Sequence, residues 1–539
     1  MSNVLILWRQ RLLRDYRQLL LWVIGIALMA YVAFVGVGQT YGTEADRAAI
    51  LSTAATQPSL LMLRGLPSGT SEGAFMAFLI LPWLALLAGM MSTFLAVRHT
   101  RTEEETGRAD LVSATPASRT APLLATILHG ARVNLVLGVL VAAVFLGTGS
   151  ESAGSWIAGA ATAATGLVFI GVGLVAAQLM RTSRGANSLA TWTLIVTLLL
   201  AGIGNALGTL STDGLRITSS GLTWLSPVGW AENTRPFSDN LLWPVLLALG
   251  VTAALITAAV IMQAVRDTGE SFVAQRRGPA AAGVALSSPL GLVWRLTRGA
   301  VIGWAIGGLV VGAMSTSLAS VVEQLGDQTE AVTQALQQMS GSDQIEQATV
   351  LVFFTMLGVL AACCAVQVIA RARQEETHGT AEAVLATATG RVRWLAGYVV
   401  IAGVGVTLIA LAGVGGAALG LLGQNGSMNL MRDVWIAAGG QVAAGGVFLA
   451  TTAVVFVLLP RLTIPIGWGI VLLATTFGMF GPIFGAPDWL VQLAPIAITP
   501  EPTATGIDPR GFWWMLLALI GGVSAALTLM NRRELATGA

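Results

Sequence analysis

The stretch EEETGRADLVSATPASR, residues 103–119, has a second copy 272 residues later in the chain, EETHGTAEAVLATATGR at 375–391. Counted from two residues before each copy, nine of nineteen positions are identical and no gap is needed. Each copy follows one long apolar run and precedes another. A polar loop that recurs between equivalent apolar runs indicates a duplicated membrane unit.

The composition predicts an all-α, polytopic membrane protein. Of the 539 residues, 55% are hydrophobic and only 10% are charged. A transmembrane helix needs about 20 predominantly apolar residues, and such runs recur along the whole chain. We predict about 12 transmembrane helices, at about 19–38, 74–97, 131–148, 155–180, 186–209, 240–265, 300–320, 347–370, 396–422, 434–459, 463–483 and 512–530.

The spans form two halves of six. We predict a first six-helix half at 1–265, a polar linker at 266–289 and a second six-helix half at 290–539. The first half begins with an amphipathic segment, 3–17, which we interpret as an interfacial helix on the membrane surface. A similar segment, 292–299, opens the second half.

The arginines predict the orientation. The sequence contains no lysine, and 23 of its 29 basic residues fall in the segments that lie inside if both termini are cytoplasmic. Positively charged residues favour the cytoplasmic side, so both termini and both copies of the loop are predicted there. Six spans per half make the repeats parallel, in a multi-pass protein of the bacterial inner (cell) membrane. The outer arginines are Arg47, Arg64, Arg216, Arg235, Arg432 and Arg510.

Charged residues need not lie in the middle of any predicted span, which argues against an ion or proton pathway. The spans do contain amides, which either form hydrogen bonds between helices or line a substrate cavity, and the sequence does not choose between these roles. The candidates are Asn134, Gln178, Asn187, Asn205, Gln367 and Gln441.

The sequence predicts no catalytic, metal or cofactor site on this chain. A phosphate-binding P-loop requires a lysine, which the chain lacks. Any energy from ATP would therefore enter through another polypeptide. Cys363 and Cys364 are neighbours inside a span, where helix geometry points them apart, so we assign them to core packing.

The acidic residues of the loop allow two interpretations. Flanking arginines could neutralise them within the chain, or a basic partner could bind both copies, which the duplication favours. Gly107 and Gly379 are expected to form the turn into a short helix. The candidate coupling residues are Arg101, Glu103, Glu104, Gly107, Asp110 and Arg119 in the first copy and Arg373, Glu375, Glu376, Gly379, Glu382 and Arg391 in the second.

This loop pattern resembles the cytoplasmic coupling loop of ABC-2 type exporter permeases. The double-length arrangement is similar to the fused permeases of tetronasin and polyketide antibiotic exporters in actinobacteria, and the resemblance covers nearly the whole chain. The second copy departs from the first where Ala388 and Gly390 replace Pro116 and Ser118. The two loops are therefore not required to be equivalent.

The resemblance implies a permease for multidrug efflux and antibiotic resistance, energised by two copies of an ATP-binding-cassette ATPase that carry ATP and magnesium. A cavity between the halves would take hydrophobic or amphipathic molecules from the lipid, and no nucleic acid partner is implied. Two alternatives stay open. A secondary transporter of the major facilitator type also has parallel six-helix repeats, and the chain could instead be a non-transport membrane partner of an ATPase.

Overall fold

The computed structural model describes residues 2–56, 58–212, 214–267, 269–273, 283, 288–319, 344–423, 430–481, 487–503 and 506–533. Within this part, twelve helices are long and apolar enough to cross a membrane, which confirms the all-α, twelve-span prediction. The described chain divides into two compact units, Met1–Arg277 and Gly278–Ala539, each with its own hydrophobic core.

The long helices of the first unit are packed around α4 and α8, which are mostly buried. Small residues permit close approach between helices in lipid. A Cβ atom added to Gly138 of α7 would lie only 2.8 Å from the carbonyl oxygen of Gly159 on α8. The six helices are α1 (Ser2–Thr40), α4 (Glu72–Arg98), α7 (Ala121–Gly147), α8 (Ser152–Leu179), α9 (Ser183–Ala206) and α11 (Trp243–Val265).

The second unit uses the same principle. A Cβ atom on Gly308 of α12 would lie 2.8 Å from the carbonyl oxygen of Ile409 on α17, so these helices pack backbone to backbone. The six helices are α12 (Pro289–Ser317), α15 (Ile345–Thr377), α17 (Arg391–Gly423), α18 (Leu430–Leu458), α19 (Thr463–Met479) and α21 (Phe512–Met530).

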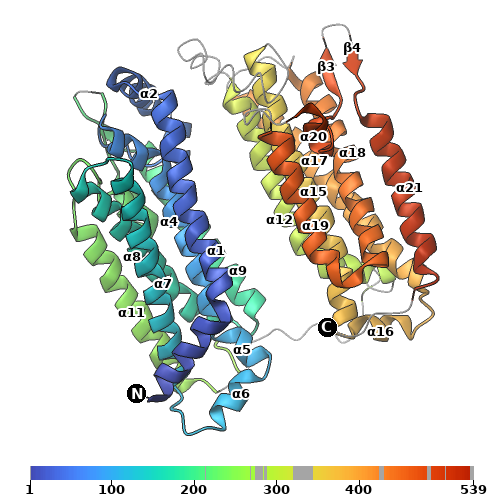
Figure 1. The fold of residues 1–539 in the computed structure, drawn as a ribbon, viewed down its shortest axis with the longest axis horizontal. Coiled ribbons are helices and arrows are strands. Elements are labelled where there is room, and N and C mark those ends of the chain that lie inside the picture. Colours follow the sequence, from blue (N-terminus) through green and yellow to red (C-terminus); the bar gives the residue numbers. More distant parts are fainter. Residues whose placement is uncertain are drawn as a thin grey trace. The chain divides into compact units, whose positions relative to one another are not determined.

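Short elements occupy the ends of the units. In the first unit, α5, α6 and the N-terminus lie at the end opposite α2, and in the second unit α16 lies opposite β3 and β4 (Figure 1). The remaining short elements are α2 (Glu44–Thr56), α3 (Pro58–Leu63), β1 (Thr209–Leu210), β2 (Ile217–Thr218), η1 (Gly221–Leu225), α10 (Pro227–Glu232), η3 (Pro460–Leu462), α20 (Asp488–Val491), η4 (Pro495–Ala497), β3 (Glu501–Thr503) and β4 (Gly506–Asp508).

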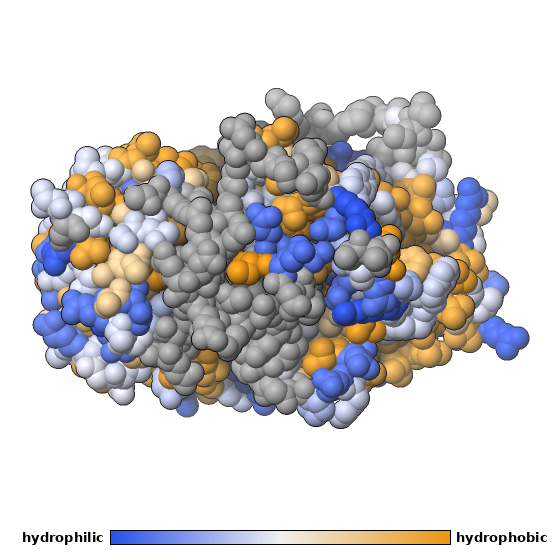
Figure 2. Space-filling model, turned by 90° about the horizontal axis from the view of Figure 1, so that it is seen from above, coloured by the Kyte–Doolittle hydropathy of each residue, from blue (hydrophilic) through white to orange (hydrophobic). Residues whose placement is uncertain are grey.

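The ends of the units differ from their sides. Figure 2 looks onto the α2 end of the first unit and onto the β3–β4 end of the second, and hydrophilic residues lie among hydrophobic ones on these ends. Along the long helices, by contrast, many large apolar side chains are exposed, such as Leu21 and Leu472. An apolar belt between polar ends is what a lipid bilayer requires.

One prediction needs correction. The interfacial helix at 3–17 is not a separate element, because α1 runs unbroken from Ser2 to Thr40 with no glycine or proline near the expected junction. Its Arg11 is buried and donates to the carbonyl oxygen of Pro122 at 2.7 Å, so it does not lie on a membrane surface. Residues 268, 274–282 and 284–287 of the predicted linker 266–289 lie outside the described residues.

Candidate coupling site

The two copies of the duplicated loop fold alike around their glycines. In the first copy, α5 (Arg101–Glu105) is followed by α6 (Arg108–Ser113); in the second, the end of α15 is followed by α16 (Thr380–Leu385). Gly107 and Gly379 precede the short helices with φ of 70° and 74°. This is the left-handed conformation, which glycine adopts without steric cost. The predicted turn is therefore present in both copies.

A pair of arginines holds Glu104 of the first copy. One carboxylate oxygen lies 2.8 Å from Arg101 on the same short helix, and the other lies 2.6 Å from Arg266, directly after α11. Arg101 is itself buried, and its Nε donates to the carbonyl oxygen of Ala177 in α8 at 2.9 Å. The loop is thereby fastened to the inner ends of α8 and α11.

The second copy repeats this arrangement around Glu376. Its carboxylate lies 3.0 Å from Arg373 and 2.6 Å from Arg533, which follows the last span α21 as Arg266 follows α11. The guanidinium of Arg533 also stacks on the ring of Phe456, 4.5 Å from its centroid. We call each Arg–Glu–Arg set, Arg101–Glu104–Arg266 and Arg373–Glu376–Arg533, a loop clamp.

The glutamates one residue earlier are held differently in the two units. Glu103 lies 2.8 Å from Arg14 and 3.5 Å from Arg11, both on α1. Glu375 instead lies 2.5 Å from Arg371, one turn earlier on its own helix, and accepts a hydrogen bond from the Thr380 hydroxyl. Each loop therefore has two glutamates that pair with arginines of their own unit. They are Glu103 and Glu104 in the first unit and Glu375 and Glu376 in the second.

Other predicted coupling residues are on the surface. Asp110 and Glu382 are exposed on α6 and α16, and Leu111 is 73% exposed beside Asp110. The loop ends return to the last span of each unit. The carbonyl oxygen of Arg119 accepts from Gln263 at 3.0 Å, and Arg391 donates to the carbonyl oxygen of Arg533 at 2.8 Å.

A cavity of about 140 Å³ lies behind α6. Its wall combines apolar loop residues, such as Val112, with the clamp residues Glu104 and Arg266 and with His99 at the end of α4. A partner side chain that entered this cavity would meet both an apolar surface and the first clamp.

The six amide candidates are mostly used inside the units. Asn134 is buried between α4 and α7 and exchanges hydrogen bonds with Ser92. Gln178 accepts from Arg266 at 2.8 Å, and Gln441 donates to the carbonyl oxygen of Ile496 at 3.3 Å. These contacts match the helix-packing alternative, and the structure does not bring the six together in one site.

The remaining three amides differ in their surroundings, since Gln367 is exposed, Asn187 is partly buried and Asn205 is fully buried. Gln367 is exposed and accepts from the indole of Trp304 at 2.6 Å. Asn187 has a buried carbonyl oxygen with no hydrogen-bond partner among the described residues. Asn205 donates to Glu232 at 2.6 Å.

Glu232 is a buried acid that the sequence analysis missed, because it lies between spans and not within one. It ends the short helix α10, which packs against α4, α8 and α9. Burial raises the pKa of its carboxyl to about 8, although the hydrogen bond from Asn205 acts in the opposite direction. A carboxyl with that pKa is largely protonated at neutral pH.

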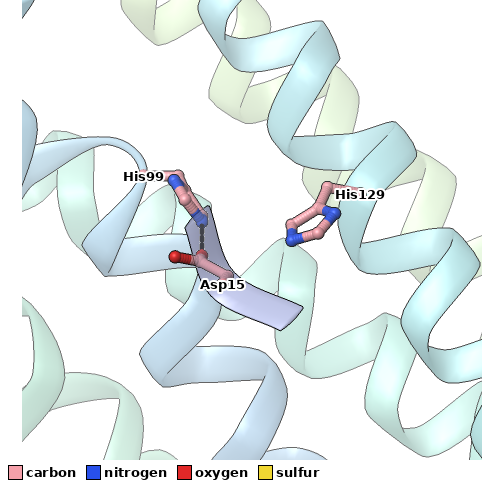
Figure 3. Close-up of side chains that lie close together, drawn as sticks. All are labelled: Asp15, His99 and His129. Carbon is pink, nitrogen blue, oxygen red and sulfur yellow. Dashed lines mark hydrogen bonds and ion pairs between the residues drawn. The ribbon is translucent and has the colours of Figure 1, made fainter. Parts of the chain in front are cut away.

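A second missed group lies beside the first loop. Asp15 on α1, His99 at the end of α4 and His129 on α7 come from distant parts of the chain and are all buried. Asp15 and His99 are joined by a hydrogen bond (Figure 3). Their only sequence signal was an acidic residue in the otherwise basic N-terminal helix and two of the three histidines of the chain.

Known proteins similar to this chain are membrane permeases. Residues 286–531 match the family model described as "Multidrug efflux system permease Rv1217c, C-terminal domain". The chain is also 33% identical to the multidrug efflux system permease protein Rv1217c of Mycobacterium tuberculosis, with 99% of this chain and 95% of that protein covered. The likeness therefore extends over both units.

Proposed function

The chain belongs to the family of the multidrug efflux system permease Rv1217c, and from this premise we propose that it is the membrane subunit of an exporter driven by a separate ATPase. Its twelve candidate spans make it a multi-pass protein of the cell membrane. As a permease it is a transport subunit and not an enzyme. ATP and magnesium would be bound by the partner.

The duplicated loop clamps support coupling to that partner. Each loop connects the second span of its unit to the third. The clamp ties the loop to an arginine that follows the sixth span. A force applied to α6 or α16 would therefore act on three spans at once, because a buried ion pair with several hydrogen bonds resists separation.

The exposed faces of the short helices are the proposed contact surfaces. Arg101, Arg373 and Glu376 are buried, so they would position the loops and not touch a partner. Asp110, Leu111 and Glu382 are exposed and would meet the ATPase directly. Two such surfaces fit two ATPase subunits. ATP binding would then act through different affinities of the ATPase pair for two states of the permease.

The proposed substrates are hydrophobic or amphipathic molecules that partition into lipid. Five of the six amides in the spans make hydrogen bonds within their own unit, as Asn134 does, and the rest of the spans is predominantly apolar. Apolar walls with a few polar groups favour such solutes over ions or sugars.

The direct test measures accumulation of lipophilic dyes, ionophores and polyketides in cells that express the chain with its ATPase. We expect accumulation to fall, and to return to the control level when the ATPase cannot hydrolyse ATP. Collapse of the proton gradient serves as a control, because Glu232 is a buried acid and a secondary transporter would depend on that gradient. Efflux that survives loss of ATP hydrolysis and disappears with the gradient would contradict the proposal.

The contact surfaces are tested by charge reversal. Asp110→Arg with Glu382→Arg should leave the permease inserted but lower the copurified ATPase and the efflux rate. The matched control reverses two acids at the ends of the units opposite these helices, the exposed Glu44 and the partly exposed Asp508. Equal ATPase retention in both double variants would exclude α6 and α16 as the docking surfaces.

A further inference from the structure

Three helices bring a carboxylate and two imidazoles together at the inner end of the first unit. One ligand atom each from Asp15, His99 and His129 can be chosen so that all three lie within 4.8 Å of one another. The side chains are nearly inaccessible, with 2%, 1% and 0% of the residue surface exposed. Figure 3 shows the ring of His129 facing the hydrogen-bonded pair of Asp15 and His99.

His129 lacks the hydrogen bonds that its burial requires. Neither ring nitrogen has a hydrogen-bond partner among the described residues. Leaving one buried polar atom unsatisfied costs roughly 1–3 kcal/mol. Its nearest aromatic neighbour is His99, whose ring centroid is 5.5 Å away in an edge-on orientation. A ligand between the two rings would satisfy a nitrogen of His129 that the protein leaves unpaired.

We propose that Asp15, His99 and His129 bind one divalent transition-metal ion of the zinc class. Two imidazoles and one carboxylate are a common donor set for such ions, at about 2.0–2.2 Å from zinc. Donor atoms around a tetrahedral ion at that distance lie about 3.3 Å apart, so the widest present separation would shorten by side-chain rotation. The ion would enter between the Asp15 oxygen and the His99 Nε2 atom that now form a hydrogen bond.

The surroundings supply the outer partners of such a site. Metal-bound histidines usually donate their other N–H to a carboxylate. The Nδ1 atom of His99 lies 3.7 Å from a carboxylate oxygen of Glu103, in the coupling loop. When Nε2 binds the ion, the proton of the neutral ring stands on Nδ1, and a small rotation of the Glu103 side chain would bring its carboxylate within hydrogen-bond distance. Metal binding would thereby fasten the first loop to α1, α4 and α7.

The arginines around the cluster do not occupy the donor atoms. Arg98 lies 3.0 Å from the other oxygen of Asp15, and Arg11 donates to the Pro122 carbonyl and the Thr126 hydroxyl. Arg14 contacts Nδ1 of His99 at 3.2 Å, but its side chain is 39% exposed and can turn to Glu103 alone.

The second unit provides an internal comparison. Its residues at the corresponding helix positions are Val301, Arg371 and Ile401, of which Val301 and Ile401 are buried. The burial pattern of α17 matches that of α7 at an offset of 272 residues, which equates Ile401 with His129. Two of the three positions are therefore apolar in the second unit, so the shared fold does not require a carboxylate or an imidazole at them.

The test uses the full chain, purified in detergent through a tag without histidines, stripped with a chelator and dialysed against Zn²⁺. We expect one tightly bound zinc ion per chain by elemental analysis, and none on His129→Ile, which installs the residue of the second unit. His378→Ala is the matched control, because it removes the one remaining histidine, which is exposed on the second loop. This control should retain the ion.

Two further measurements keep the result independent of folding defects. Co²⁺ added to the unaltered chain should give the visible absorption bands of a low-symmetry nitrogen–oxygen site, and Zn²⁺ should abolish them. Glu103→Gln should weaken zinc binding roughly 10- to 100-fold, as for other outer partners. Absence of stoichiometric metal on the unaltered chain, or equal binding by His129→Ile, would overturn the proposal. Both results are independent of whether the chain is an exporter.

Discussion

The inner ends of the two units share their clamps and differ in nearly everything next to them. Glu104 and Glu376 each join an arginine three residues earlier to an arginine after the sixth span. The neighbouring Glu103 reaches to α1, whereas Glu375 stays on its own helix with Arg371. The duplicated part is thus the connection between loop and last span, whereas among the described residues an ion pair from the loop to the first span occurs in the first unit.

The backbone shows the same contrast. In the first unit α4 ends at Arg98 and α5 starts at Arg101, so His99 and Thr100 interrupt the helix before the loop. In the second unit α15 continues without a break to Thr377. The second loop directly continues its helix, whereas the first loop is attached through a helix break and a polar cluster. We infer that the first loop is the adjustable one.

The largest effect is expected from breaking the clamps. Removal of one partner from a buried ion pair costs about 3–5 kcal/mol, because the other charges remain buried. Glu376→Ala should be the more destabilising variant, since the Glu376 side chain is fully buried and that of Glu104 is 13% exposed. Denaturant titration in detergent measures the unfolding free energies of Glu376→Ala and Glu104→Ala, which are then compared with each other.

The surface glutamate of the same loop is the control for this prediction. Glu382→Ala should change the unfolding free energy by less than about 0.5 kcal/mol, as surface substitutions usually do. If Glu104→Ala and Glu376→Ala were as mild as Glu382→Ala, the clamps would not hold the loops.

The next effect is a dependence on pH that comes from Glu232 of the first unit, for which the matching position of the second unit has no counterpart. Glu232 lies five residues after Pro227, and the matching position after Pro495 is Pro500, which cannot titrate. The pKa of the Glu232 carboxyl is about 8 in the folded chain and 4.5 in the unfolded chain. Unfolding therefore releases a proton between these values, and the free energy of unfolding should fall as pH rises.

The free energy of unfolding should fall by at most about 1.4 kcal/mol per pH unit, the limit for release of one proton. Glu232→Gln removes the titrating group and should flatten the curve between about pH 5 and 8, when measured against the unaltered chain in the same detergent. Identical pH profiles for the two proteins would show that Glu232 is ionised in the folded state.

The smallest effect should be equal in the two units. Gly107 and Gly379 have positive φ, and an added Cβ atom would meet no other atom within 4 Å at either position. Substitution by alanine should therefore cost only the conformational penalty, roughly 1–2 kcal/mol each. Thermal unfolding of both variants measures it, and a clear difference would mean that the two turns are held by different contacts.

Much of the fold was predictable from the sequence. Apolar runs are read directly as spans, and the predicted 512–530 agrees with α21 (Phe512–Met530). The third span was predicted to start at residue 131, ten residues after the actual start of α7 at Ala121. Polar side chains in the first turns, such as Thr126 and His129, interrupt the apolar run, although neighbouring helices bury them. Hydropathy cannot distinguish a polar residue in water from one that is buried and paired.

The site was predictable only in part for a related reason. The duplication pointed to the loop, and Arg101 and Glu104 are three residues apart on one helix face. Arg266 lies 162 residues from Glu104, and Asp15 lies 84 residues from His99. Contacts over such separations follow from helix packing, which local spacing does not encode.

The central claim is that α6 and α16 are the surfaces on which an ATPase acts. A photoreactive amino acid at Leu111, and another at the matching Ala383, tests this claim most directly in membranes that contain the ATPase. We expect cross-links to the ATPase from both positions, and none from Ala45 on α2 or Thr503 on β3 at the opposite ends of the units. Cross-links from Ala45 or Thr503, with none from Leu111 and Ala383, would contradict the account.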